Sequence, residues 1–410
     1  MEKTRKHRSD ILITISMVAL LLIGLLIIYV LSPLRANVVN AAYKSGVEPM
    51  HFFTKQLFSV AMALVAFLVA FKVIPYKFLQ KFSKLAIIVG IGLSVLLWIL
   101  ALAGSSLAKC ELGECRWFNL GFITFQPADV LKICLAIYLA GFLAQKKADD
   151  LIGDIKEFWM PLGIVMAISL FLVVVAQGDL GSGVSLMVIF LSMIFAAGVP
   201  LKQFFIVLGL IVAAAVVLIM SSSVRMARVN TWWSVLTGSG ESTDSTYHID
   251  NALLAIGSGG FWGVGMGNSV QATGYLPESI NDSIFAIMGE IFGFVGLVGI
   301  IGLFALLLFR IAKTAEYTAD VEKRMAVIGI FGWIAAQIIV NIMAMTGLIP
   351  VTGITLPLIS YGGTSMVFVS FGIGIVAQLS CYTGREVKNE DISSRRGIRG
   401  TRNSGSSRRS

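Results

Sequence analysis

Ten runs of apolar residues constrain this chain more than any other feature of its sequence. Each run is close to the roughly 20 residues that an α-helix needs to cross the hydrocarbon core of a membrane. Only 13% of the 410 residues are charged and 57% are hydrophobic, whereas soluble globular chains have about 25% charged residues. We therefore predict an all-α, polytopic membrane protein with helices over 11–31, 57–74, 84–104, 128–144, 159–177, 183–199, 203–220, 283–309, 325–347 and 362–380.

The distribution of Lys and Arg predicts the orientation of these spans, because cytoplasmic segments retain positive charge. With the N-terminus inside, the cytoplasmic segments hold 24 of the 32 Lys and Arg residues, the outer segments hold seven, and Lys132 lies within a span. The run 11–31 is too long for a signal-peptide core and no small-residue cleavage site follows it, so we expect a retained first span. The prediction is a plasma-membrane protein with both termini in the cytoplasm.

The chain divides into parts of different composition. We expect a cytoplasmic N-terminal tail at 1–10, one membrane domain at 11–380 and a cytoplasmic tail at 381–410. The last tail is rich in Ser, Gly and Arg with few apolar residues, so it cannot build a core and is predicted to be disordered. Its expected partner is anionic lipid of the inner leaflet. Nucleic-acid binding has no support from aromatic residues there, and we expect none.

The connection 221–282 is the longest in the chain and is predicted to lie on the outer side. Loops longer than about 15 residues are usually functional or disordered. This one combines arginines, the pair "WW", a helix-like run "YHIDNALLAIG" and the glycine-rich "GSGGFWGVGMGNS". Such a mixture indicates a folded cap over the outer end of the helices.

Cysteine and histidine residues give little sign of a metal site. Cys110 and Cys115 share an outer loop, where a disulfide would persist, whereas Cys134 and Cys381 resemble ordinary small apolar residues. The three histidines are scattered along the chain. The glycine-rich segment has no Lys and does not follow a strand, so neither a P-loop nor a dinucleotide fingerprint is indicated.

Ionisable residues within membrane spans are costly, so each one is a candidate functional residue. Asp129 and Lys132 are three residues apart, so they can pair on one helix face. Lys132 could instead meet an anionic ligand from the outer side. Asp179 stands in the short connection "AQGDLGSG", where Asp and Gly favour a turn. Glu290 lies inside a span, and we expect it to be a buried partner of a cation or a polar contact between helices.

Asp282 lies where the polar segment "GYLPESIND" becomes the eighth span. Asp is a preferred helix N-cap, and negative charge there suits the helix dipole. The adjacent Asn281 could cap the helix equally well, which would leave Asp282 available for chemistry. Both interpretations stay open at this point.

Positive charges on the outer side are the candidates for binding an anion. Arg225 and Arg228 follow the seventh span, in a position that the distribution of charge across membranes disfavours. Guanidinium groups match phosphate oxygens well. Arg116 and Lys109, in another outer loop, could join the same basic rim.

Five segments of the sequence resemble the signature blocks of the SEDS family, whose members include FtsW, RodA and SpoVE. They are "RWFNLGFITFQPADVLK" (116–132), "AQGDLGSG" (176–183), "HIDNALLAIGSGGFWGVGMGNS" (248–269), "GYLPESINDSIFAIMGEIFGF" (274–294) and "GLIPVTGITLPLISYGGTS" (347–365). The resemblance runs from the first span to the tenth and implies ten membrane helices with a large outer loop between the seventh and eighth. It also implies a glycosyltransferase that uses lipid II at the outer face of the plasma membrane.

The resemblance assigns roles to three of the candidate residues. Asp282 matches the essential carboxylate of the family, Lys132 the lysine of the first block, and Asp179 the aspartate of the second. The chain departs from the family pattern with Ala128 for Ser, Asp129 for Glu, and Gly178 for Pro. The first two departures leave the role of Asp129 open.

The chemistry implied by the family needs fewer groups than glycoside hydrolysis, which uses two carboxylates. A sugar on a polyprenyl pyrophosphate already has a good leaving group. What remains is one base for the incoming hydroxyl, for which we predict Asp282, and cations that stabilise charge on the pyrophosphate. The sequence requires no cofactor, and Mg²⁺ or Mn²⁺ could assist at the pyrophosphate.

The resulting prediction is a polymerase that forms β-1,4 glycan strands from lipid II with inversion, in cell division at the septum. Its expected partners are lipid II, the nascent strand, a class B penicillin-binding protein that crosslinks it, and other division proteins. The alternatives are a RodA-like elongation polymerase, a lipid II flippase, or a non-catalytic scaffold for a transpeptidase.

Overall fold

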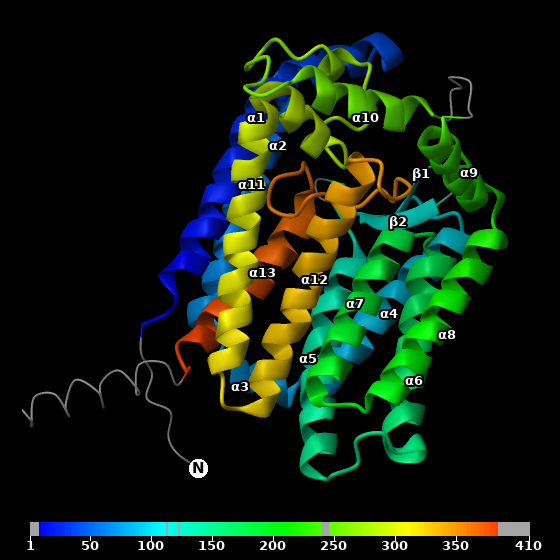
Figure 1. The fold of residues 1–410 in the computed structure, drawn as a ribbon, viewed down its shortest axis with the longest axis vertical. Coiled ribbons are helices and arrows are strands. Elements are labelled where there is room, and N and C mark those ends of the chain that lie inside the picture. The colour runs from blue at the N-terminus through cyan, green and yellow to red at the C-terminus, as the bar shows by residue number, and fades with distance from the viewer. Residues whose placement is uncertain (1–7, 112–113, 122–123, 239–245, 384–410) are drawn as a thin grey trace, which may run out of the picture.

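The protein, obtained as a computed structural model, is a bundle of membrane-spanning helices with a cap at one end (Figure 1). The structure describes residues 8–111, 114–121, 124–238 and 246–383. Within these residues, ten helices are long and apolar enough to span a membrane, as predicted. They are α1 (Ile11–Tyr43), α2 with η1 (His51–Val73), α4 (Ser83–Leu102), α5 (Pro127–Ala148), α6 with η2 and η3 (Ile155–Ala176), α7 (Leu180–Ala197), α8 (Leu201–Met220), α11 (Ile284–Tyr317), α12 (Val321–Met345) and α13 (Gly363–Ser380).

The predicted spans end close to the observed ones, except in the two longest helices. The helix α1 continues to Tyr43 rather than 31, and α11 continues to Tyr317 rather than 309. Beyond its apolar run α1 still makes tertiary contacts, because the Ser32 hydroxyl donates to the Pro49 carbonyl at 2.6 Å. Both helices therefore extend beyond the apolar runs from which their lengths were predicted.

The helices α5, α7 and α12 pack against one another in the middle of the bundle, and α2 packs along α13. Residues of α5 and α12 are mostly buried, with the whole Trp333 side chain enclosed. In contrast, α8 has no buried residue and lies at the edge of the bundle (Figure 1). Apart from Lys202 and Gln203 in its first turn, α8 is apolar, and a membrane is the environment that such an unburied apolar helix requires.

Short π-helical turns interrupt two of the spans. They are η1 (Val69–Val73) after α2 (His51–Leu68), and η2 (Ile155–Trp159) and η3 (Phe171–Ala176) on either side of α6 (Met160–Leu170); the short α3 (Tyr76–Lys81) follows η1. Backbone groups freed at such places need partners inside a membrane protein. At η1 the side chain of Gln378 supplies these partners. Its Nε2 donates to the backbone carbonyls of Ala70 and Ile74, and its Oε1 accepts from the backbone amide of Tyr76.

The two ends of the described chain meet at the end of the bundle opposite the cap (Figure 1). Asp10 is the N-cap of α1, and its backbone amide donates to the Ser380 hydroxyl. Its carboxylate accepts a hydrogen bond from Arg310 Nε at 2.7 Å. The tails 1–7 and 384–410, which include the predicted lipid-binding segment, lie outside the described residues.

A small antiparallel sheet lies at the cap end, between α4 and α5. Its strands are β1 (Ala108–Glu111), β2 (Glu114–Asn119) and β3 (Thr124–Phe125), in the order β1-β2-β3. A disulfide joins Cys110 of β1 to Cys115 of β2, so the pairing that the sequence allowed is present.

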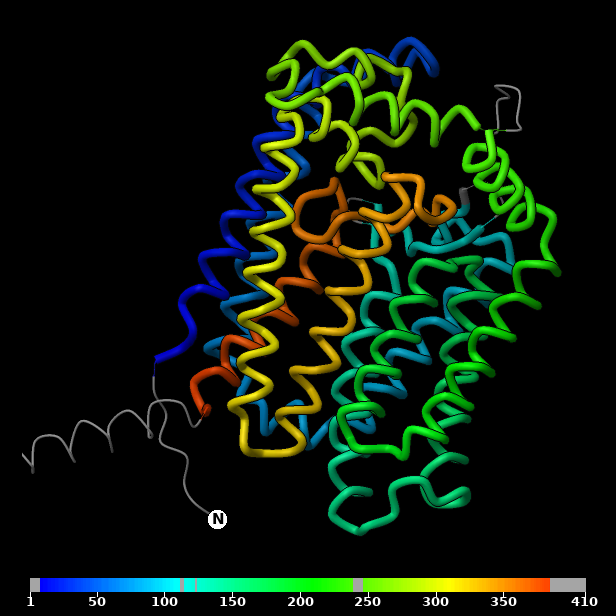
Figure 2. Tube along the Cα trace, in the orientation of Figure 1, coloured from blue at the N-terminus to red at the C-terminus, as the bar shows by residue number. Residues whose placement is uncertain are grey.

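The predicted cap contains α9 (Ser223–Thr237), α10 (Tyr247–Ser258) and the turn η4 (Gln271–Thr273). The trace crosses the end of the bundle before it enters α11 (Figure 2). Glu290 of α11 anchors this trace, because its carboxylate accepts from the Ser269 hydroxyl and from the amides of Val270 and Gln271. Glu290 was expected to pair with a cation or to bridge two helices, and its partners are instead a hydroxyl and backbone amides of the cap segment.

A break in α11 joins the cap to the bundle through backbone hydrogen bonds. Gly293 has φ 66° inside α11, which frees neighbouring backbone groups. The amides of Val264 and Gly265 donate to the carbonyls of residues 290 and 291, and the amides of residues 294 and 295 donate to those of residues 260 and 261. Gly263 lies at this contact with φ +84°, and a Cβ there would overlap the Ile291 carbonyl. The glycine-rich segment is therefore a packing element.

We predict that Gly263→Ala destabilises the fold, because a Cβ would push the cap away from α11. Gly267→Ala is the matched control: its φ is +88°, and a Cβ there meets nothing within 4 Å. Overpacking typically costs about 1–3 kcal/mol, so the midpoint of thermal unfolding in detergent should fall by several degrees more for Gly263→Ala than for Gly267→Ala. Equal midpoints would contradict the packing role.

Candidate active site

A cavity of about 860 Å³ lies between the cap and the cap-side turns of the central helices. Its walls come from the β-sheet, α5, α7, α9, α10, α12, the segment before α11 and the segment 351–365. The ionisable residues that line it are Lys109, Arg116, Asp129, Lys132, Asp179, Arg228, His248, Glu278 and Asp282. Six of the eight residues predicted for the site, all except Arg225 and Glu290, are brought together here.

Backbone contacts from two other elements position Asp282. The side-chain amide of Asn341 in α12 donates through Nδ2 to the Asp282 backbone carbonyl at 2.8 Å and to the Ile354 backbone carbonyl at 2.7 Å. The Tyr361 amide donates to the Ile280 carbonyl at 2.8 Å. The N-cap of α11 is Ser283, so neither Asp282 nor Asn281 occupies the capping position that the sequence allowed. The Asp282 side chain is left for another role.

The environment of Asp282 makes its carboxyl a usable base near neutral pH. The residue is 7% exposed, and its Oδ1 atom has no hydrogen-bond partner among the described residues. Burial raises the pKa of Asp282 to about 7, and the negative charge of Glu278 adds to the rise. A raised pKa favours proton uptake, and desolvation is the main physical cause.

Glu278 and His248 surround Asp282. Glu278 has a backbone φ of 50°. Its carboxylate accepts from the side-chain Nδ2 of Asn281, and its Oε1 lies 3.5 Å from a terminal guanidinium nitrogen of Arg35 in α1. His248 Nε2 lies 2.7 Å from the Ser283 hydroxyl, which itself donates to the Pro277 carbonyl. Burial lowers the pKa of His248, partly opposed by Glu278, so a neutral imidazole ties α10 to the start of α11.

Asp129 and Lys132 form the ion pair that their spacing allowed. Lys132 Nζ lies 2.9 Å from Asp129 Oδ1, and both side chains are almost completely buried while still lining the cavity. Asp129 Oδ2 has no partner among the described residues. Pairing does not decide whether Lys132 also meets a ligand, because the ammonium group has further donors.

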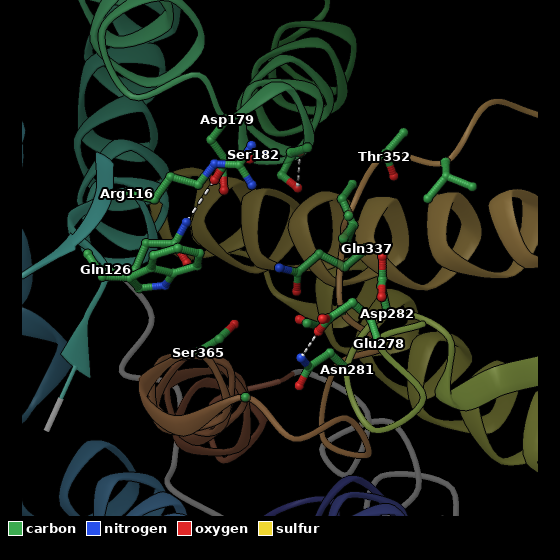
Figure 3. Close-up of a pocket in the computed structure, with 18 of the residues that line it drawn as sticks. Arg116, Gln126, Asp179, Ser182, Glu278, Asn281, Asp282, Gln337, Thr352 and Ser365 are labelled. Atoms are coloured by element: carbon green, nitrogen blue, oxygen red, sulfur yellow. Dashed lines mark hydrogen bonds between the residues drawn. The ribbon is translucent and has the colours of Figure 1, made fainter. Parts of the chain in front are cut away.

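Asp179 is the N-cap of α7 and faces Asp282 across the cavity. Its Oδ1 accepts from the Ser182 amide at 2.9 Å, and its Oδ2 accepts from Gln126 Nε2 at 2.7 Å. Arg116 lies beside it (Figure 3). The turn predicted for Asp179 is therefore also a helix start, and its carboxylate has two donors.

The two arginines of α9 have different surroundings. Arg228 lines the cavity. Arg225 lies outside the lining and donates to the carbonyls of Val174, at 2.7 Å, and Leu218, at 3.2 Å. Its guanidinium therefore satisfies the ends of η3 and α8, which connects α9 to the bundle.

Sequence reasoning missed several residues that shape the cavity, namely His248, Glu278, Gln337 and Asn341. Asn341 and Gln337 are uncharged polar residues in an otherwise apolar span, and that was a usable signal. His248 had no such signal, because only the folded cap brings it beside Asp282, whereas Glu278 stands in the same polar segment as Asp282. No group of three or more His, Cys, Asp or Glu side chains in the described part of the chain is arranged to hold a metal ion.

Comparison with known proteins extends over most of the chain. A family model described as cell cycle protein, covering FtsW, RodA and SpoVE, matches residues 10–385. Stage V sporulation protein E of Bacillus subtilis (strain 168) is 35% identical over 385 residues, which cover 93% of this chain and 99% of that protein. A protein of Escherichia coli O6:H1 named probable peptidoglycan glycosyltransferase FtsW is 33% identical over 344 residues, covering 83% and 79%.

Solved structures share the fold. The rod shape determining protein RodA of Thermus thermophilus superposes with a TM-score of 0.63 at 23% identity, covering 91% of this chain and 96% of its own. A chain of a structure described as the structural coordination of polymerization and crosslinking by a peptidoglycan synthase complex gives a TM-score of 0.69 at 21% identity, covering 91% and 97%.

We predict that Lys132→Met lowers stability, because it leaves Asp129 charged and unpaired in the bundle. Breaking one partner of a buried pair typically costs about 3–5 kcal/mol, whereas replacing both partners by apolar residues is often neutral. The double variant Asp129→Leu/Lys132→Met should therefore recover thermal stability that Lys132→Met loses. A single variant as stable as the parent would show that the pair does not contribute to the fold.

Proposed function

This chain belongs to the FtsW, RodA and SpoVE family of cell cycle proteins and is a multi-pass membrane peptidoglycan glycosyltransferase; from this premise we propose that it polymerises glycan strands from lipid II with Asp282 as the base. The observation that carries the proposal is a buried carboxyl with a free oxygen and a pKa of about 7, inside a cavity that also holds four cationic side chains.

The reaction follows from these groups. A sugar hydroxyl of the acceptor attacks the anomeric carbon of the donor sugar, from the face opposite the pyrophosphate. The new carbon–oxygen bond forms as the bond to the polyprenyl pyrophosphate breaks, which inverts the configuration. Asp282 accepts the hydroxyl proton. Because pyrophosphate leaves without protonation, no second carboxylic acid is needed.

Cations on the cavity wall would stabilise the departing pyrophosphate. Lys132, Arg116 and Arg228 line the cavity and are our candidates. Arg225 lies outside the cavity lining and donates to backbone carbonyls, so we assign it to the placement of α9. Asp179 would orient the same wall through Gln126 and Ser182.

A divalent cation is compatible with this reaction and not required by it. Mg²⁺ keeps several waters and binds through one or two carboxylates together with substrate phosphates. Asp129 lines the cavity, and its Oδ2 atom, unpaired within the described residues, fits one such contact and leaves Asp282 as the base; the cation would supply further charge neutralisation at the pyrophosphate.

The orientation proposed from Lys and Arg places the cavity at the outer face of the plasma membrane. An even number of spans puts both termini on one side, and that side holds most of the positive charge. Lipid II held in the outer leaflet would then present its sugar to the cavity. The tail beyond residue 383 is proposed to contact anionic lipid at the inner face.

We assign the activity to cell division at the septum, with a class B penicillin-binding protein as the crosslinking partner and other division proteins beside it. Several relatives are named FtsW, and one solved structure of this fold is described as coordinating polymerization with crosslinking. An elongation role, lipid II flipping and a non-catalytic scaffold are the alternatives that the following experiment separates.

We predict that Asp282→Asn abolishes glycan polymerisation from labelled lipid II, measured on purified protein together with its transpeptidase partner. Asn keeps the size of the side chain but cannot take up the proton, and loss of a general base typically costs about 10²–10⁴-fold in rate. Asp250→Asn is the matched control, because Asp250 is exposed on α10 and lies outside the cavity lining.

The parent and Asp250→Asn should polymerise alike, while Asp282→Asn binds its partner and unfolds at the temperature of the parent. A fully active Asp282→Asn would move the base elsewhere in the cavity. If the parent binds lipid II and makes no polymer, the flippase and scaffold alternatives replace the polymerase.

A further inference from the structure

The β1–β2 hairpin rests directly on the turn that carries Asp179. Arg116 of β2 donates through a terminal nitrogen to the Gly178 carbonyl at 3.1 Å and also pairs with Glu114. The Glu114 side chain lies over the α-carbon of Gly178. Two contacts, one from Arg116 and one from Glu114, therefore join a hairpin and a turn that are more than 60 residues apart in sequence.

Gly178 is the residue that permits this contact. Its φ is +69°, and a Cβ there would lie 2.8 Å from both Cγ and Cδ of Glu114. The ring of proline fixes φ near −65°, so the Pro of the family pattern cannot adopt this conformation. In this chain the residue types at positions 178 and 114 are therefore coupled by geometry.

The turn under the hairpin sets one wall of the cavity. Asp179 is held by the Ser182 amide and by Gln126, and all three residues line the cavity opposite Asp282 (Figure 3). Movement of Gly178 would move the Asp179 carboxylate and the start of α7 with it, because the Gly183 amide donates to the Asp179 carbonyl.

The disulfide closes the hairpin beside the two residues that touch the turn. Cys110 and Cys115 face each other across β1 and β2, and Cys115 lies between Glu114 and Arg116. At this end β2 pairs with β1 alone, because β3 pairs only with the far end of β2. Without the disulfide this end would depend on a few hydrogen bonds between two strands, and a two-stranded pairing is at best marginally stable in water.

We propose that the disulfide-closed hairpin is a clamp on the Asp179 turn, in which Glu114 and Arg116 are positioning residues. The clamp holds residues 178–182 so that the wall bearing Asp179 and Gln126 keeps its distance from Asp282. Its effect on the reaction rests on the proposed polymerase function, whereas its effect on the turn does not.

The first test measures hydrogen exchange of the amides in 177–183, in the detergent-solubilised full chain with and without its partner. In Cys110→Ser/Cys115→Ser these amides should exchange about tenfold faster than in the parent, because local opening becomes easier. Cys381→Ser, at the opposite end of the bundle, is the control and should leave these amides unchanged. Thermal unfolding of each variant shows that the bundle is intact.

The second test is a double-mutant cycle between positions 114 and 178. In Gly178→Ala the new Cβ displaces Glu114 from Arg116, so exchange in the turn should rise and the polymerisation rate should fall about threefold to tenfold, the size of one lost hydrogen bond. Gly46→Ala carries a similar backbone strain, with φ +63° and nothing within 4 Å of a Cβ, and should change neither.

The clash needs both side chains, so the effect of Gly178→Ala should be smaller in a Glu114→Ala background than in the parent. Additive effects, or unchanged exchange in both the serine and the Gly178→Ala variants, would overturn the clamp. If no variant and no parent polymerises, the polymerase fails alone, because hydrogen exchange still reports on the turn.

Discussion

Burial of the Asp282 carboxyl, with its Oδ1 atom left without a hydrogen-bond partner among the described residues, is the constraint on which the rest of the site depends. Hydrogen bonds from the backbone amides of residues 282 and 283 lower the pKa of Asp282, but burial outweighs them, so the carboxyl remains a usable base. A carboxylate on a loose segment would lack a defined position. The protein meets both needs by holding the backbone around Asp282, through Asn341 and through the bond between Tyr361 and Ile280, while Oδ1 stays free.

That arrangement requires the cap to be docked firmly on the membrane helices. The break at Gly293 frees backbone groups that form hydrogen bonds with the segment around Gly263. The Glu290 carboxylate then accepts from the backbone amides of Val270 and Gln271, which holds the turn η4 in place. Glu290, inside the eighth span, thus holds the cap segment that leads to Asp282 at the start of the same span. On the opposite wall, the hairpin and the Asp179 turn form a second supported surface, and the cavity lies between the two.

The membrane fold could be predicted because hydrocarbon imposes length and apolarity on each span separately. The ends of α1 and α11 could not, since after the apolar run has ended α1 still contacts Pro49 through Ser32 and α11 contacts Asp10 through Arg310. The candidate carboxylates and Lys132 could be found as costly charges in or beside spans. The positions of Arg225 and His248 could not be predicted. Arg225 is placed by a carbonyl of η3 and His248 by its contact with Ser283 in the folded cap, and no local sequence pattern indicates either contact.

The pH dependence of glycan formation at low lipid II concentration tests most directly whether Asp282 is the base. Only the deprotonated carboxyl can take the proton, so the rate should rise about tenfold per pH unit below pH 7 and level off above it. In Glu278→Gln this limb should move to lower pH, because the charge of Glu278 contributes to the raised pKa of Asp282. A rate that shows no ionisation near pH 7 in the parent, or an identical limb in Glu278→Gln, would contradict the account.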